Sequence, residues 1–241
     1  MLKLSKNNLK QLAERLRLNK RGRAAFTLAE ILITLGIIGV VAALVMPSLI
    51  ASYREKAAVV KLKKFYSVIS QAYQSAIFDN GSPDGWNLIA SADGQGAENM
   101  FNILSRYLNV SKRCGNNPGC FSSYPFVDYT YSYSKAVLAD GSQIAIYIRD
   151  PDCKANVGTT SSLSNTCASI RYSVGQYRFE FWLTKDRVVP IGSPEEGYVP
   201  FETGCIKSAP DSSCTAWTLY NENMNYMHCT GLSWNGKTKC D

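Results

Sequence analysis

The stretch that decides the fold of this chain is ILITLGIIGVVAALVMPSLI, residues 31–50, which directly follows Phe26-Thr-Leu-Ala-Glu30. It contains 20 residues and no charged side chain. A helix of about 20 apolar residues is about 30 Å long, the thickness of the hydrocarbon core of a bilayer. Helices of water-soluble cores are rarely apolar on every side, and the apolar part of a cleaved secretory signal has only about 7–15 residues. We therefore expect one membrane-spanning helix.

The positive charge of the chain is concentrated before this segment. Residues 1–25 contain eight lysines and arginines and one acidic residue, Glu14, so they carry a net charge of +7. The whole chain also has a net charge of +7, so the remaining residues are neutral overall. Because positively charged flanks stay in the cytoplasm, we expect the N-terminus inside and the C-terminal part exported. A neutral exported part has no general basic surface, so we expect no nucleic-acid partner.

The cysteines agree with export, because an oxidising compartment favours disulfide bonds. All eight lie beyond the apolar run, at Cys114, Cys120, Cys153, Cys167, Cys205, Cys214, Cys229 and Cys240. Their spacing favours pairing each cysteine with its next neighbour in order, since the separations within these pairs are 6, 14, 9 and 11 residues. A Cys214–Cys229 bridge is an alternative, and other connectivities stay open. Each such loop contributes on the order of 2–3 kcal/mol to stability.

A metal site is the competing interpretation of the cysteines. The chain has no Cys-x-x-Cys motif, and His228 is its single histidine. We therefore expect no metal and no cofactor. Asp128, Asp150 and Asp152 could support calcium, but they lack the spacing of an EF-hand, so solvated loop carboxylates are the favoured interpretation.

Phe26-Thr-Leu-Ala-Glu30, followed by the apolar run, resembles the cleavage and methylation signal of type IV prepilins and type II secretion pseudopilins. In that family a peptidase on the cytoplasmic side cuts before the phenylalanine and methylates the new amine. The resemblance places the cut between Ala25 and Phe26. The family prefers glycine before the cut, where this chain has Ala25. Pro47 occupies the region where many members carry a helix-kinking proline.

The resemblance also implies a role for Glu30, the fifth residue after the cut. In the family, the glutamate of an incoming subunit pairs with the terminal amine of a neighbour. A charge at the centre of a bilayer costs roughly 2.5–3.5 kcal/mol, and pairing offsets this cost. The alternative is an interfacial carboxylate that reaches water. The implied partners are other pilin or pseudopilin subunits, the prepilin peptidase, the inner-membrane assembly platform and membrane lipid.

The helix is expected to continue beyond the membrane. Apolar side chains recur at steps of three or four between Ala58 and Ile77, and the turn-rich segment 80–85 ends the pattern. One helix from Phe26 to about Phe78 follows. The expected regions are a basic cytoplasmic leader (residues 1–25), a transmembrane and assembly helix (26–52), an amphipathic continuation of the helix (53–80) and an exported globular head (81–241).

The head has the pattern of an α+β domain. Residues 97–110 resemble a short helix, and two strand pairs flank short turns at 136–149 and 176–191. Four strands joined in hairpins favour an antiparallel sheet, with the amphipathic half of the long helix on one face. We therefore expect a pilin-like α+β fold with a disulfide-braced, loop-rich C-terminal region. In that region Trp217, Tyr220, Tyr226 and Trp234 are expected to pack together, and a ligand-facing aromatic patch is the alternative.

Enzymatic motifs are absent from the sequence. It has no GxSxG, no HExxH and no phosphate-binding glycine loop, and one histidine is a poor basis for a catalytic triad. We therefore expect no enzyme. The prediction is a structural subunit of a type IV pilus or type II secretion pseudopilus in the bacterial inner membrane. The 216 residues after the cut exceed many major pilins, which favours a minor subunit. The alternatives are a membrane-anchored extracytoplasmic adhesin or ligand-binding module and a tethered exported enzyme.

Overall fold

The computed structural model describes residues 27–89, 94–117, 120–121, 133–157, 163–194, 201–206, 209–210 and 213–240. The expected leader and the expected processing site at Ala25 and Phe26 lie outside these residues. The chain divides into two compact units, Met1–Ala51 and Ser52–Asp241. The second unit contains the sheet and all of the disulfides.

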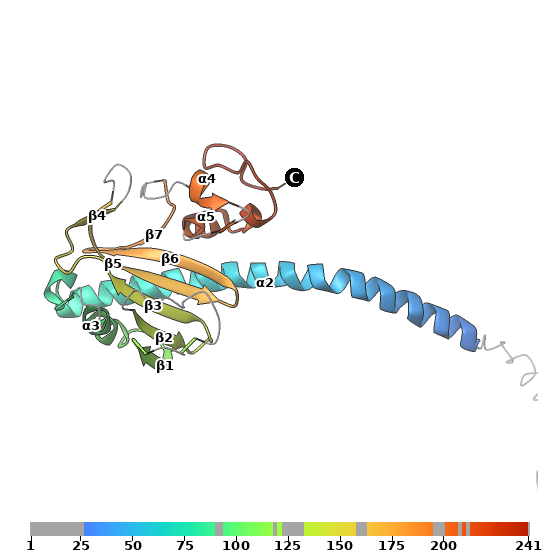
Figure 1. Cartoon of the computed structure of the whole chain (residues 1–241), viewed down its shortest axis with the longest axis horizontal. Helices are drawn as coiled ribbons and strands as arrows, with labels where there is room; N and C mark the ends of the chain where they lie inside the picture. The colour runs from blue at the N-terminus through green and yellow to red at the C-terminus, as the bar shows by residue number, and fades with distance from the viewer. Residues whose placement is uncertain are drawn as a thin grey trace, which may run out of the picture. The chain divides into compact units, whose positions relative to one another are not determined.

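The helical elements of Figure 1 are one long helix and several short ones. They are α2 (Leu28–Asn80), η1 (Pro83–Gly85), α3 (Gln95–Leu104), α4 (Phe201–Gly204), α5 (Cys214–Asn221) and η2 (Asn225–Met227). The strands are β1 (Val110–Gly115), β2 (Ser134–Leu138), β3 (Gln143–Ile148), β4 (Ala155–Val157), β5 (Leu163–Val174), β6 (Tyr177–Thr184), β7 (Val188–Pro190), β8 (Cys205–Ile206) and β9 (Ala209–Pro210).

Helix α2 is continuous over 53 residues and runs through Pro47. It ends because Gly81 adopts a left-handed conformation with φ of +77°, which glycine tolerates without steric cost. The N–H of Gly81 donates to the Ile77 carbonyl at 2.9 Å, and Pro83 then starts the short helix η1. The expected single helix across the apolar run and its amphipathic continuation is confirmed, and it ends two residues later than expected.

Within the described residues, seven strands form one antiparallel sheet in the order β1-β2-β3-β5-β6-β7, with β4 paired to β5. Both expected hairpins are present, as β2–β3 and β6–β7. The turn of the first uses Asp140 and Gly141, and Gly141 has φ of +79°. The α+β class is therefore confirmed.

Two expectations about the head were wrong. The sheet has more than four strands, because the 12-residue strand β5 lies at its centre and was not anticipated. The short helix does not reach Val110: it ends at Leu104, and Val110 begins the strand β1, which pairs with β2. The segment Val110–Gly115 is polar and lies at the edge of the sheet, so it lacks the alternating apolar pattern of a half-buried strand.

One face of the sheet packs against the second half of α2. Phe65 of the helix stacks on Tyr172 of β5 with ring centroids 4.0 Å apart, and Tyr66 stacks on Phe181 of β6 at 5.7 Å. The buried residues of the helix are Ala58, Val59, Leu62, Phe65, Ile69, Ala72, Tyr73 and Ala76. This is the amphipathic helix covering a sheet face that the residue pattern predicts.

The opposite side of the sheet has a smaller core of its own. Trp182 of β6 packs there with Val189 and Ile191, together with Val157 and Leu163. Strand β6 is therefore buried on both sides. Its first half alternates apolar and polar residues, and its second half has three consecutive apolar residues, Phe181 to Leu183.

The described part of residues 201–240 forms a loop-rich cap that contains α4, α5 and η2. It is attached to the end of the sheet by a close backbone contact. The Ala216 N–H donates to the Ile191 carbonyl at 3.0 Å, and a Cβ added to Gly192 would lie 1.8 Å from the Ser213 carbonyl oxygen. Gly192 also has φ of +86°, so both the conformation and the space at this junction require glycine.

Candidate functional site

The first candidate site is the N-terminal half of α2. Its leucine, isoleucine, valine and methionine side chains are all exposed, from 43% at Ile31 to 79% at Leu28. So large an apolar surface is unfavourable in water and indicates contact with lipid or with other proteins. The helix is long enough and apolar enough to cross a membrane.

The polar side chains of this half are satisfied within the helix. The Thr34 hydroxyl donates to the Ile31 carbonyl at 3.0 Å, and the Ser48 hydroxyl donates to the Val45 carbonyl at 2.9 Å. Hydroxyls that bond back to their own helix lose little when water is removed. These two residues therefore do not oppose burial in lipid or among helices.

The N-terminus of α2 is closed by a reciprocal cap between Thr27 and Glu30. The Thr27 backbone N–H and hydroxyl donate to Oε2 of Glu30 at 2.8 and 2.9 Å, and the Glu30 N–H donates to the Thr27 hydroxyl at 3.2 Å. This is the capping-box arrangement, in which each side chain satisfies a backbone N–H of the first turn. The geometry gives Glu30 a role within its own subunit.

The expected role of Glu30 between subunits is compatible with this cap. Both bonds from Thr27 end on Oε2, and Oε1 accepts no hydrogen bond from any described residue. A carboxylate has four lone-pair directions, so the capping carboxylate keeps acceptor capacity for another donor. The capping role itself was missed, although the Thr-x-x-Glu spacing before an apolar run is its recognised sequence signal.

In the second unit, two polar side-chain contacts connect α2 to the cap. Nε2 of His228 lies 2.8 Å from Oε2 of Glu55, and Nζ of Lys63 lies 2.5 Å from Oε1 of Glu222. Glu55 and Lys63 are eight residues apart, which is about two helical turns on one side of α2. The exposed Lys63–Glu222 ion pair adds little stability by itself, and together the two contacts join the cap to two points along α2.

The cap aromatics form a packed cluster. Phe201 stacks on Trp217 with centroids 3.9 Å apart, and Trp217 lies 5.1 Å from Trp234. Trp217 is fully buried and Tyr226 is 3% exposed, whereas Tyr220 is 56% exposed at the edge of the cluster. Packing of the cap is thus the role that the geometry supports, and it leaves Tyr220 as the one widely exposed ring of the four expected aromatic residues.

Four disulfides brace the head. They join Cys114 to Cys120, Cys153 to Cys167, Cys205 to Cys214, and Cys229 to Cys240. These are the pairs favoured by the spacing, and Cys214 is joined to Cys205 instead of to Cys229. Cys205–Cys214 and Cys229–Cys240 both lie in the cap, which has little regular structure of its own.

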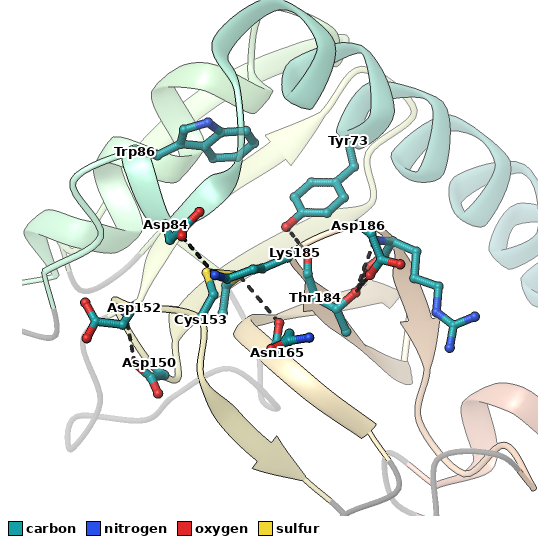
Figure 2. The surroundings of a disulfide bond; sticks show 12 residues. Tyr73, Asp84, Trp86, Asp150, Asp152, Cys153, Asn165, Thr184, Lys185 and Asp186 are labelled. Carbon is teal, nitrogen blue, oxygen red and sulfur yellow. Dashed lines mark hydrogen bonds and ion pairs between the residues drawn. A yellow bond between two sulfur atoms is a disulfide. The ribbon is translucent and has the colours of Figure 1, made fainter.

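The surroundings of Cys153–Cys167 are shown in Figure 2. Lys185, in the turn after β6, donates from its backbone N–H to the Asn165 carbonyl at 3.0 Å and places its ammonium 2.9 Å from Asp84. The Ser82 hydroxyl and this ammonium lower the pKa of the Asp84 carboxyl. The hydroxyl of Tyr73, from α2, donates to the Thr184 carbonyl at 2.6 Å. These contacts tie the end of α2 to the β6–β7 turn.

The aspartates that were considered for calcium, and expected to be loop carboxylates, make local contacts. The Asp152 N–H donates to Oδ1 of Asp150 at 2.9 Å, and Lys154 lies 3.2 Å from Oδ2 of Asp152 (Figure 2 shows both aspartates). Asp128 lies outside the described residues. Within the described part of the chain, no three histidine, cysteine, aspartate or glutamate side chains come together as metal ligands.

Comparison with known proteins identifies the family of this chain. No curated protein matches the chain significantly. No solved structure matches it significantly either. A model of a family of unknown function, DUF6613, matches residues 48–235, starting near the end of the apolar run and covering most of the second unit. Because this match covers well over half of the sequence, the chain belongs to the DUF6613 family.

Proposed function

We propose that the protein is a minor subunit of a type IV pilus or of a type II secretion pseudopilus. The observation that carries this proposal is the exposed apolar half of α2, which begins with Glu30 in its first turn. The segment Phe26-Thr-Leu-Ala-Glu30 and the basic leader before it support the same function. The subunit is cut between Ala25 and Phe26, held in the inner membrane with its head exported, and then assembled through this helix.

The apolar surface of the helix suits both insertion in the membrane and assembly into a filament. A helix that is apolar on every side is stable in lipid and can also pack against several neighbouring helices. Its partners are other pilin or pseudopilin subunits, and its processing requires the prepilin peptidase and the assembly platform.

Processing is tested by sequencing the N-terminus of the protein made in cells with an active prepilin peptidase. We expect the mature chain to begin at Phe26 with a methylated amine. Ala25→Glu should block the cut, because a large charged side chain replaces the small one at the cleavage position, while the apolar run still inserts. A chain that retains Met1 in the presence of the active peptidase contradicts the proposal.

The role of Glu30 is tested by separating its charge from its capping function. Glutamine also serves at this position of a capping box, so Glu30→Gln keeps the cap and removes the charge. Thr27→Ala removes most of the cap and keeps the charge. If pairing with a neighbour's amine drives assembly, Glu30→Gln should lower incorporation into filaments strongly, and Thr27→Ala should lower it little. The opposite order assigns Glu30 to capping alone.

A membrane-anchored ligand-binding module is the second candidate, and it is favoured by a pocket of about 330 Å³ in the head. The two functions differ in what they require of the apolar helix. An anchored module needs only insertion, so replacing residues 31–50 by an unrelated membrane span should leave it active. A filament subunit should fail to assemble after the same replacement.

A further inference from the structure

The pocket in the head lies between α2 and the β2–β3 hairpin. Its volume is about 330 Å³, near the lower end of the range for small-molecule sites, about 300–1,000 Å³. The lining residues come from α2, the segment after α3, the hairpin and β5, and they are Lys64, Phe65, Val68, Leu108, Asn109, Leu138, Ala139, Asp140, Ser142 and Tyr172. All of them belong to the second unit.

Most of the wall is apolar. Phe65 and Tyr172 stack with an interplanar angle of 10°, and Leu108 and Leu138 are buried beside them. Val68, on the outer side of α2, is 37% exposed. A flat or branched hydrocarbon group fits such a wall, because apolar contact and loss of water both favour it.

Tyr172 contributes apolar surface to this wall. Its side chain is fully buried, and its hydroxyl has almost no accessible surface, so the hydroxyl does not reach a ligand in the pocket. The ring stacks on Phe65 and supports the apolar wall from behind.

The charges around the pocket favour an anion. Asp140 accepts from the Ser142 N–H at 3.0 Å and from the Ser142 hydroxyl, so its carboxylate is used inside the hairpin turn. Lys61 donates to the Asp140 carbonyl at 3.3 Å, and the positive charges of Lys61 and Lys64 both act on the Asp140 carboxylate. Lys64 makes no ion pair within the described part of the chain. Two lysines against one aspartate leave a net positive charge.

We propose that this pocket binds a small amphipathic monocarboxylate, with an aromatic or branched hydrocarbon body against Phe65 and Leu108. The Lys64 ammonium binds its carboxylate. The inference is independent of filament assembly, because it rests only on residues of the second unit.

The test uses the full-length protein in lipid nanodiscs with labelled leucine and valine methyl groups. The probes are 3-phenylpropionate, the neutral 3-phenylpropan-1-ol and the cationic 3-phenylpropylamine. We expect 3-phenylpropionate to shift the methyl signals of Val68, Leu108 and Leu138 saturably, and to leave those of Leu163 and Val189 unchanged. Because the signals come from named methyl groups, partitioning of the probe into lipid does not count as binding.

Variants test the proposed contact of Lys64. Lys64→Met should weaken 3-phenylpropionate about tenfold, the effect of losing one charge-assisted hydrogen bond, and leave the alcohol within about twofold. Lys56→Met is the matched control, since Lys56 is exposed two turns earlier on α2 and does not line the pocket, and it should change neither affinity.

Three results would overturn the proposal. One is the absence of saturable shifts at the pocket methyl groups with all three compounds. Another is tighter binding of the amine than of the acid, which would assign the pocket to cations through Asp140. The third is an equal effect of Lys64→Met and Lys56→Met on 3-phenylpropionate.

Discussion

The two halves of α2 share one backbone conformation and have opposite surroundings. Leu44, in the first half, is 75% exposed, whereas Leu62, in the second, is fully buried against the sheet. The first half is apolar on all sides, and the second is apolar on one side and carries lysines elsewhere. The comparison shows that both halves can form one continuous helix although their side chains differ. The placement of apolar residues around the helix axis, on all sides or on one side, matches the surroundings of each half.

The largest expected effect comes from truncating a leucine in each half. Leu62→Ala should lower the free energy of unfolding of the head by about 2–5 kcal/mol, because it leaves a cavity in a closely packed core. Leu44→Ala should leave it unchanged. The measurement is urea unfolding of the full-length protein in detergent, followed by tryptophan fluorescence. Equal effects at the two positions would contradict the difference in surroundings.

Alkaline pH should destabilise the head by a comparable amount. Burial raises the pKa values of Tyr73, Tyr172 and Tyr226, and Asp186 adds to the shift at Tyr73. A group with a raised folded-state pKa stabilises the fold below its unfolded pKa, about 10 for tyrosine, and loses this contribution as the pH rises above it. Each tyrosine should therefore remove up to about 1.4 kcal/mol per pH unit above pH 10. Unfolding midpoints between pH 8 and 12 measure this slope, and Tyr73→Phe should make it shallower.

A smaller difference is expected from removing one hydroxyl in each environment. Tyr73→Phe deletes the bond to the Thr184 carbonyl, and the loss of a buried hydrogen bond should cost about 1–2 kcal/mol at neutral pH. Tyr53→Phe, at a position that is 73% exposed, is the matched control and should have no effect on the stability of the head. If both variants unfold at the same urea concentration as the parent, the Tyr73 contact does not stabilise the head.

The smallest effect should be confined to the beginning of the helix. Thr27→Ala removes the hydroxyl of the capping box, which is worth about 0.5–2 kcal/mol to the first turn. Amide exchange in lipid should speed up at residues 28–31 and stay unchanged in the head. Thr27→Ser is the control that keeps the hydroxyl, and exchange equal to that of the alanine variant would argue against capping.

The parts of the fold that were predictable are those whose residues repeat with a clear period. The long helix, the β2–β3 and β6–β7 hairpins and the sheet face covered by α2 all follow from such periods. Strand β5 does not, because it buries Thr166, Ser169 and Ser173 at the centre of the sheet, where polar residues resemble a loop sequence. Its burial depends on partners that lie elsewhere in the sequence.

Some candidate sites are likewise predictable from local sequence, whereas others are formed by residues far apart in the chain. The apolar run and the segment before it are local signals that the sequence alone displays. The contact of Lys63 with Glu222 joins residues 159 positions apart, and that of Glu55 with His228 joins residues 173 apart, so no local pattern predicts either. The pocket beside Lys64 likewise exists only where α2, the hairpin and β5 meet.

The position of the cysteines has a mechanical consequence. Every cysteine lies at or after Cys114, so no covalent cross-link joins α2 to the strands that it covers. A pulling force that enters α2 at its N-terminal end is resisted by noncovalent contacts, among them the Phe65–Tyr172 stack, the Tyr73 hydroxyl and the contacts of α2 with the cap. Under load, the helix should slide off the sheet while the disulfide-bonded loops keep their shape. The interface between α2 and the sheet should therefore separate at a lower force than the rest of the second unit.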